Sequence, residues 1–191
     1  MIKSQPATVL TICLVVLPLL VNGQTRSGKE HAGYEIHFTF DGVVHRQKSG
    51  NQYTYTKGLD GKALHVTPGE FASVPLTVSN DLGNGIRSSF SILFWVRTEM
   101  TSKQSAVMLS RKNFPDKGLV AQKNPGWVFY ISDGTWAWNL GSGKLRITHE
   151  RDKGQTMPLN DGNWHQLAMT YNQNKMEVRL YYDGMNQAIY H

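Results

Sequence analysis

The chain has 191 residues, enough for one domain with its own hydrophobic core, and it carries a formal net charge of +6 at pH 7. Its basic residues are interspersed with acidic ones and form no cluster of five or more, so the composition argues against a nucleic-acid partner, although a basic surface also suits an anionic polysaccharide. The only cysteine is Cys13, which excludes a fold held together by disulfide bonds within the chain.

The N-terminal segment has the pattern of a secretory signal peptide. Lys3 precedes an apolar run from Ala7 to Val21. We predict a signal peptide over residues 1–23, cleaved between Gly23 and Gln24, and therefore a secreted protein, either extracellular or periplasmic. A membrane anchor is the alternative. An apolar run of roughly 15 residues is shorter than the ~20 that a spanning helix needs, so we expect no transmembrane segment after cleavage.

The remaining residues divide into a short lead-in and one domain. Residues 24–33 are polar and contain glycine, which predicts a flexible lead-in. From Tyr34 to His191, turn residues interrupt the chain about every 8 to 15 positions, and no window shows the apolar period of a helix. Short strands at this spacing predict an all-β domain of two antiparallel sheets packed face to face.

The clearest strand pattern lies near the C-terminus. Side chains from Trp164 to Tyr171 alternate between two faces, as expected of a half-buried strand. A polar break follows at Asn172–Lys175, and a second run, Met176–Asp183, closes at Asp183-Gly184. This arrangement predicts a β-hairpin. We expect His165, in its first strand, to pack or hydrogen-bond within the domain.

Five short strand patterns precede this hairpin, at Ile36–Gly42, Gly58–Val66, Phe90–Arg97, Val107–Lys112 and Gly126–Ile131. Together with Trp164-His165 and with Tyr181-Tyr182-Asp183-Gly184, they resemble, in the same order, the laminin G-like and pentraxin-like members of the concanavalin A-like lectin/glucanase superfamily. The resemblance covers nearly everything from Tyr34 onward. It implies a two-sheet antiparallel jelly-roll sandwich over residues 34–191.

The C-terminal end departs from the pattern of that family. In the family, the hairpin is followed by a further stretch with a closing strand that pairs beside the first one, whereas this chain stops at His191. We therefore predict that the domain lacks its closing strand and that the chain is a fragment of a longer polypeptide. Modules of this kind often flank a secreted hydrolase, so the resemblance also implies a C-terminal catalytic domain in a longer parent chain.

The sequence offers no constellation typical of an enzyme. Retaining glycoside hydrolysis needs two carboxyl groups about 5 Å apart, and the glucanase branch supplies them from one strand. Glu35 and Glu177 each stand without a second acid on their strands, Glu150-Arg151-Asp152 falls in a predicted charged loop, and no Gly-x-Ser-x-Gly elbow is present. We predict a non-catalytic protein. The alternative is a glycoside hydrolase that uses one of these glutamates with a partner elsewhere.

Metal-binding patterns are equally weak. The seven histidines show no metal-ligand spacing, and no D-x-D-x-D loop occurs. The resemblance implies that calcium can bind at the rim of the sandwich, where Asp116, Asp133, Asp152 and Asp161 lie in predicted loops. We therefore expect no required cofactor, with calcium as the one candidate ion.

The segment Tyr130–Leu140 is the best candidate for a recognition surface. Trp136 and Trp138 point the same way from one predicted strand, and indole faces stack on sugar rings. Tyr130, Asp133 and Asn139 lie beside them and offer polar groups for sugar hydroxyls. In the alternative interpretation, both tryptophans fill the space between the sheets. Trp95 and Trp164 belong to runs that we assign to the core.

These observations predict a secreted, non-catalytic module that binds carbohydrate or another extracellular ligand. The fold rests on the pattern and order of the strands, whereas binding rests on the family resemblance. A protein-interaction or adhesion module is the alternative function, because laminin G-like domains also bind receptors and matrix proteins.

Overall fold

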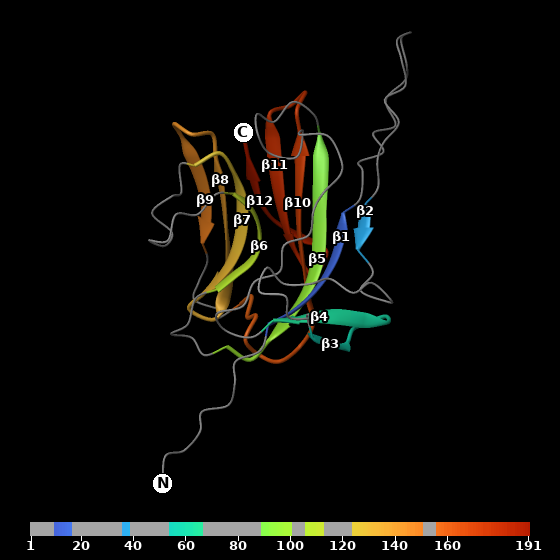
Figure 1. The fold of residues 1–191 in the computed structure, drawn as a ribbon. Coiled ribbons are helices and arrows are strands. Elements are labelled where there is room, and N and C mark those ends of the chain that lie inside the picture. The colour runs from blue at the N-terminus through green and yellow to red at the C-terminus, as the bar shows by residue number, and fades with distance from the viewer. Residues whose placement is uncertain are drawn as a thin grey trace.

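The computed structural model describes residues 10–16, 36–38, 54–66, 89–100, 106–112, 124–150 and 156–191. Every regular element within these ranges is a β-strand, and the strands form two antiparallel sheets that face each other (Figure 1). This confirms the predicted all-β sandwich. The same ranges contain no helix that is long and apolar enough to cross a membrane.

Within these ranges, the larger sheet contains eight strands: β1 (Leu10–Val16), β2 (Ile36–Phe38), β3 (Thr54–Lys57), β4 (Lys62–Val66), β5 (Phe90–Thr98), β10 (His165–Asn172), β11 (Glu177–Tyr182) and β12 (Met185–Tyr190). Their spatial order is β12-β11-β10-β5-β1-β4-β3, and β2 pairs with β1. The described part of the smaller sheet has four strands: β6 (Ala106–Lys112), β7 (Gly126–Ser132), β8 (Thr135–Gly141) and β9 (Arg146–Glu150). Each of these strands pairs with the next one along the chain, in the order β6-β7-β8-β9.

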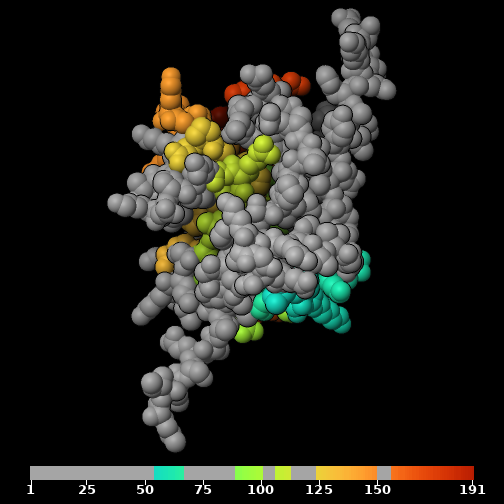
Figure 2. Space-filling view, viewed as in Figure 1, coloured from blue at the N-terminus to red at the C-terminus, as the bar shows by residue number. Residues whose placement is uncertain are grey.

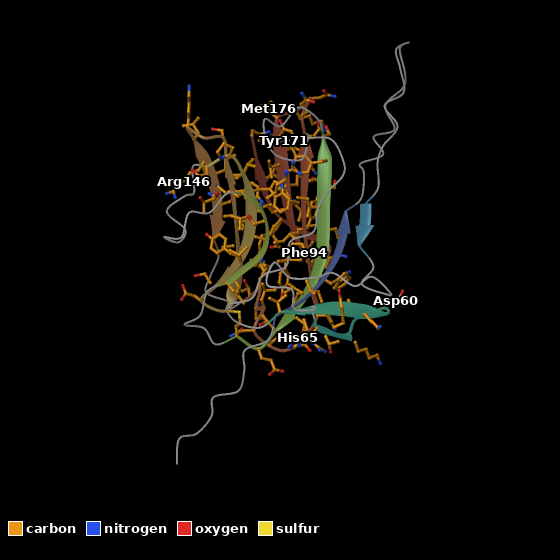
Figure 3. The ribbon with its side chains drawn as sticks, viewed as in Figure 1. Asp60, His65, Phe94, Arg146, Tyr171 and Met176 are labelled. Atoms are coloured by element: carbon orange, nitrogen blue, oxygen red, sulfur yellow. The ribbon has the colours of Figure 1, made fainter. Side chains whose placement is uncertain are left out.

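Strand β5 shows why the larger sheet buries one face. Its alternate residues Phe90, Ile92, Phe94 and Val96 are buried, and the residues between them are half-buried. Because side chains of a strand point alternately to opposite faces, this pattern places the buried set toward the facing sheet. Phe94 accordingly projects into the space between the two sheets (Figure 3).

Aromatic contacts within and between the sheets form the centre of the core. The rings of Phe94 on β5 and Phe129 on β7 meet edge to face, with centroids 5.1 Å apart. Phe129 in turn stacks on Trp136 of β8 at 6.5 Å, and Trp138 stacks on Tyr190 of β12 at 6.2 Å. Such pairs add to the hydrophobic free energy gained by removing these large side chains from water.

The predicted C-terminal hairpin is confirmed as β10 and β11, which pair from Leu167↔Tyr182 to Asn172↔Glu177. A further strand, β12, follows the Asp183-Gly184 turn and pairs with β11. The sequence did not predict β12, because Met185 and Asn186 at its start are both exposed and break the apolar alternation.

The run Gly58–Val66 is part strand and part turn. Its second half is β4, and its first half is the turn that leads back to an unpredicted partner, β3. Together, β3 and β4 form a hairpin at the surface of the molecule (Figure 2). The runs at Phe90, Val107 and Gly126 correspond to β5, β6 and β7, and Ile36–Phe38 is β2.

The apolar segment within the predicted signal peptide has a place in the larger sheet. As β1, it lies between β5 and β4 and runs antiparallel to both (Figure 1). Cleavage after Gly23 stays a prediction, and the predicted lead-in, residues 24–33, lies outside the described residues.

Two leucines provide a matched test of the core. Leu180 on β11 is 0% exposed, whereas Leu145, in the turn between β8 and β9, is 76% exposed. Leu180→Ala should lower the free energy of unfolding by about 2–5 kcal/mol, because it removes buried surface and leaves a cavity. Leu145→Ala should change that free energy by less than about 0.5 kcal/mol. Urea unfolding followed by circular dichroism measures both, and equal losses would contradict this placement of the inward face of β11.

Candidate functional site

The two tryptophans predicted to form a sugar platform lie in the core. Trp136 and Trp138 are both 0% exposed and point from β8 toward the larger sheet. Strand β8 is paired on both sides, with β7 and with β9, and its alternate residues pack against the aromatic core. The platform interpretation is therefore corrected in favour of its alternative, because a ligand at the surface cannot reach these indole faces.

The other predicted site residues are divided between two places. Tyr130 and Asn139 point to the opposite face of the smaller sheet from the two tryptophans, and they are 2% and 1% exposed. Asp133 lies in the exposed turn between β7 and β8, with a φ of 53°. The five residues predicted as one ligand site thus do not come together.

A polar cluster surrounds Asn139 on the outer face of the smaller sheet. The Lys112 Nζ atom donates a hydrogen bond to Asn139 Oδ1, and Asn139 Nδ2 donates to Thr148 Oγ1 at 3.2 Å. Burial, and to a smaller extent the neighbouring positive charge of Arg146, lower the pKa of Lys112 to about 8. Arg146 lies at the start of β9, at the edge of this sheet (Figure 3).

A different aromatic surface lies on the outer face of the larger sheet. Trp95 and Arg97 project outward from β5, since their neighbours Phe94 and Val96 are buried against the core. The Arg97 guanidinium carbon lies 5.1 Å from the centre of the Trp164 ring, within the range of a cation–π contact. Gln166 is paired with Trp95 across the two strands. We call Trp95, Arg97, Trp164 and Gln166 the aromatic–arginine patch.

The patch contains the two tryptophans that the sequence pattern assigned to the core. Trp95 and Trp164 are half-buried, whereas the pair predicted to be at the surface is fully buried. The sequence did contain a signal for the exposed position of Trp95: the polar residues Ser91 and Arg97 lie on the same face of β5. Polar residues at alternate positions mark the solvent face of a strand.

Hydrogen bonds to His165 fix the hairpin beside Trp164. The ring of His165 is buried, with Nδ1 2.8 Å from Asp183 Oδ2 and Nε2 3.1 Å from Asp161 Oδ1. The Tyr182 hydroxyl lies 2.8 Å from Nδ1 and donates to the carbonyl oxygen of Pro158 at 2.7 Å. This network joins the turn before β10 to the turn after β11.

The same two aspartates hold the backbone on both sides of Trp164. The backbone N–H of Asn163 donates to Asp161 Oδ1 at 2.9 Å, and that of Gln166 donates to Asp183 Oδ1 at 2.7 Å. The N–H of Gly162 donates to the carbonyl oxygen of Thr98 at 3.2 Å, which ties the turn to the end of β5. Trp164 therefore extends from a backbone whose position is set by its neighbours, which lowers the entropy lost when a ligand binds.

The predicted calcium ligands do not form a cluster in the part of the chain that the structure describes. Within that part, no group of three or more His, Cys, Asp or Glu side chains could hold a metal ion. Asp116 and Asp152 lie outside the described residues. Asp161 is engaged by Asn163 and His165. Calcium binding stays a prediction.

Of the three glutamates considered for hydrolysis, Glu177 lies at the start of β11. Its Oε1 atom accepts a hydrogen bond from Arg179 Nε at 2.7 Å, and this contact is an ion pair. The pair lowers the pKa of Glu177. A general acid needs the opposite shift, toward neutral pH, so Glu177 does not fit that role.

A laminin G-type family model described as the concanavalin A-like lectin/glucanases superfamily matches residues 68–190. Among solved structures, the chain is similar to the crystal structure of the binding domain of Paraclostridial Mosquitocidal Protein 1, with a TM-score of 0.50 and 14% sequence identity. That match covers 94% of this chain and 40% of the solved chain. At this identity the likeness shows the fold alone. No curated protein sequence matches.

The Asp161 carboxylate should make stability depend on acid pH. Burial alone would raise the pKa of Asp161, but hydrogen bonds from the backbone and side chain of Asn163 and from His165 favour the charged form, and the pKa is lowered from 3.8. The ionised group therefore stabilises the fold above the unfolded-state pKa, and this contribution is lost as the pH falls through the lowered value.

Two variants test this linkage by urea unfolding at a series of pH values between about 2.5 and 6. Asp161→Asn should flatten the loss of stability on the acid side, because the titrating group is gone. Asn163→Ala removes only one of the donors and should give an intermediate slope. An acid limb that is the same in Asp161→Asn and wild type would refute the role assigned to this carboxylate.

The Lys112 pKa offers a second titration. Because the pKa of Lys112 is lowered from 10.5 to about 8, the folded state releases this proton first, and stability should rise with pH between these two values. Arg146→Gln should move the pKa upward, since it removes the repelling charge and leaves only the effect of burial. NMR titration of ¹³C-methylated lysines measures both midpoints. A wild-type midpoint near 10.5 would contradict the described environment.

Proposed function

The chain belongs to the concanavalin A-like lectin/glucanases superfamily, and from this membership we propose that it is a secreted, non-catalytic module that binds carbohydrate through the aromatic–arginine patch. The observation that carries the proposal is the placement of Trp95 and Trp164 on the outer face of the larger sheet, with Arg97 against the ring of Trp164. The predicted signal peptide supports secretion.

The chemistry of the patch suits a sugar ring. Indole faces provide the flat apolar surface on which the C–H face of a pyranose stacks. The amide of Gln166, which is paired with Trp95, offers both a donor and an acceptor for hydroxyl groups. The guanidinium of Arg97 adds a permanent positive charge with a planar set of donors that matches a carboxylate or sulfate group. We therefore propose an acidic glycan as the preferred ligand.

The patch is also held in position before a ligand arrives. Trp164 follows the turn that Asp161 closes, and Gln166 is fixed by Asp183. A binding surface with a fixed backbone loses less conformational entropy on association than a mobile loop does. This rigidity favours a role in binding over one that needs a moving catalytic loop.

A protein ligand is the second candidate, and edge strand β12 favours it. Met185 and Ile189 on this strand are 66% and 46% exposed. The strand ends the larger sheet in the described part of the chain, and its six residues carry no charge. Uncharged edge strands with exposed apolar side chains are surfaces that other chains can pair with.

We further propose that the module serves as an accessory part of a larger secreted protein, in which a catalytic domain is the expected partner. The chain spans less than half of the solved chain that it resembles, so modules of this fold occur within longer polypeptides. A glycoside hydrolase stays the less favoured alternative. It would need a second carboxyl group about 5 Å from one of the three glutamates.

A glycan array with neutral, carboxylated and sulfated sugars tests the proposed function. Trp164→Ala and Trp95→Ala should each weaken binding by about tenfold or more, as expected when a central aromatic contact is truncated. Arg97→Gln should weaken binding of acidic sugars and spare neutral ones. The control is Leu145→Ala, which changes an exposed side chain in the turn between β8 and β9.

Each variant is first shown to melt cooperatively, so that loss of binding is not loss of fold. The array is run with calcium and again with a chelator, and a loss with chelator alone would place a metal at the site. Failure of the folded wild-type chain to bind any glycan, or unchanged binding by Trp164→Ala, would reject the patch as a sugar site. Binding of a protein ligand that the Trp variants retain would favour the second candidate.

A further inference from the structure

The aromatic–arginine patch occupies one end of a longer face of the larger sheet. Strands β5, β10 and β11 lie side by side in that sheet (Figure 1). On β10, Leu167 and Met169 are fully buried against the core. The residues that alternate with them, Gln166, Ala168 and Thr170, therefore point to the outer face. We call these three residues the β10 strip, which begins within the patch at Gln166 and runs away from it.

The β10 strip carries a very short side chain between longer ones. Ala168 is paired with Leu93 of β5 on one side and with Tyr181 of β11 on the other. Side chains paired in this way lie on the same face of a sheet and flank one another. Leu93 and Tyr181 are half-buried, so part of each side chain reaches solvent. A linear ligand over β10 would thus have a larger side chain on each side of it.

A second aromatic residue with an arginine beside it lies at the far end of the strip. Tyr181 and Arg179 share the outer face of β11, and Arg179 is paired with Thr170. The Arg179 side chain is 41% exposed. From Trp164 to Thr170 the chain spans about 20 Å, at roughly 3.3 Å per residue. This distance is longer than one sugar ring can cover.

The two arginines differ in the charges around them. Arg179 Nε donates a hydrogen bond to Glu177 Oε1 at 2.7 Å, and this carboxylate neutralises the cation. Of the ion pairs among the described residues, none involves Arg97, whose guanidinium lies over an indole ring. The nearest acid along the chain, Glu99, points toward Gly162. An anionic group is therefore attracted to the Arg97 end of the face and not to the Arg179 end.

We propose that the ligand of the patch is an oligosaccharide that lies lengthwise over the β10 strip, with an acidic sugar at Arg97 and a neutral sugar at Tyr181. This inference rests on the proposed carbohydrate-binding function and adds the length and the polarity of the ligand. Aromatic rings at both ends supply stacking surface for sugars. An acidic group at the far end would have to compete with Glu177 for Arg179, which lowers the affinity for a ligand that is acidic throughout.

A length series of sugars tests the proposal on the full chain. The probes are linear β-linked glucose, xylose and galactose oligosaccharides of two and of about six sugars, each in a neutral form and with glucuronic acid at one end or at both. Isothermal titration calorimetry should show that the singly acidic long probe binds about tenfold or more tightly than its short form, because only the long probe reaches Tyr181. The doubly acidic long probe should bind more weakly than the singly acidic one.

Two variants test the far end of the face. Tyr181→Ala should remove the advantage of the long probe and leave binding of the short probe unchanged. Ala168→Gln adds bulk in the middle of the strip and should have the same effect. The matched control is Met185→Ala, which changes an exposed residue of the neighbouring strand β12 and should keep the advantage. Each variant is first shown to melt cooperatively, and Tyr181→Ala decides if Ala168→Gln does not fold.

A charge variant tests the polarity. Glu177→Gln leaves Arg179 without its anion, so the doubly acidic long probe should bind this variant about threefold or more tightly than it binds the wild-type chain. The singly acidic probe should bind both chains equally. Arg97→Gln should remove the preference for acidic over neutral probes.

Three outcomes would overturn this inference and leave the proposed function standing, provided that Trp164→Ala still abolishes binding. They are equal affinities for long and short probes, an unchanged advantage of the long probe in Tyr181→Ala, and tighter binding of the doubly acidic probe by the wild-type chain. Binding of polyglutamate in place of every sugar would assign the face to an acidic peptide. A folded chain that binds no probe, or that binds equally well as Trp164→Ala, would reject the proposed function and this inference with it.

Discussion

The alternation of side chains along β5 is the constraint on which the rest of the structure depends. On one face of this strand, the side chains of Phe90, Ile92, Phe94 and Val96 point into the core, where they contact the aromatic residues of the smaller sheet. The side chains of Trp95 and Arg97 point to the outer face of the sheet. A slip of one residue in its register would exchange these two sets and expose the core, so packing and the proposed binding surface are determined together.

The network around His165 extends this order to the C-terminal hairpin. Its ring joins the two aspartates that close the turns on either side of the hairpin, and both aspartates also bind backbone N–H groups. A buried polar network that is well satisfied restricts the backbone to one arrangement. Trp164 lies between Asn163 and Gln166, whose backbone N–H groups these aspartates bind. The buried network therefore also restricts the backbone beside the exposed part of the hairpin.

The strand pattern was predictable where alternation was strong and turn residues marked the ends, as in β10 and β11 with the Asp183-Gly184 turn. It was not predicted in β3, which is only four residues long, or in β12, whose first residues Met185 and Asn186 are both exposed. The candidate site was harder still. Period two shows that Trp136 and Trp138 share a face, but which face is inward depends on the facing sheet, which a single strand pattern does not reveal. The all-β sandwich could therefore be predicted from strand patterns that are local in the sequence. Which residues lie on its surface could not, because that depends on how the two sheets pack against each other.

The tryptophans form two optical populations. Trp127, Trp136 and Trp138 are held in an apolar interior, whereas Trp95 and Trp164 are partly in contact with solvent. The intrinsic fluorescence of the folded chain is thus the sum of a blue-shifted emission that aqueous quenchers do not reach and a red-shifted emission that they do. The first reports on whether the two sheets are together, and the second on whether anything covers the outer face. One unlabelled spectrum can therefore separate folding from occupancy in the same sample.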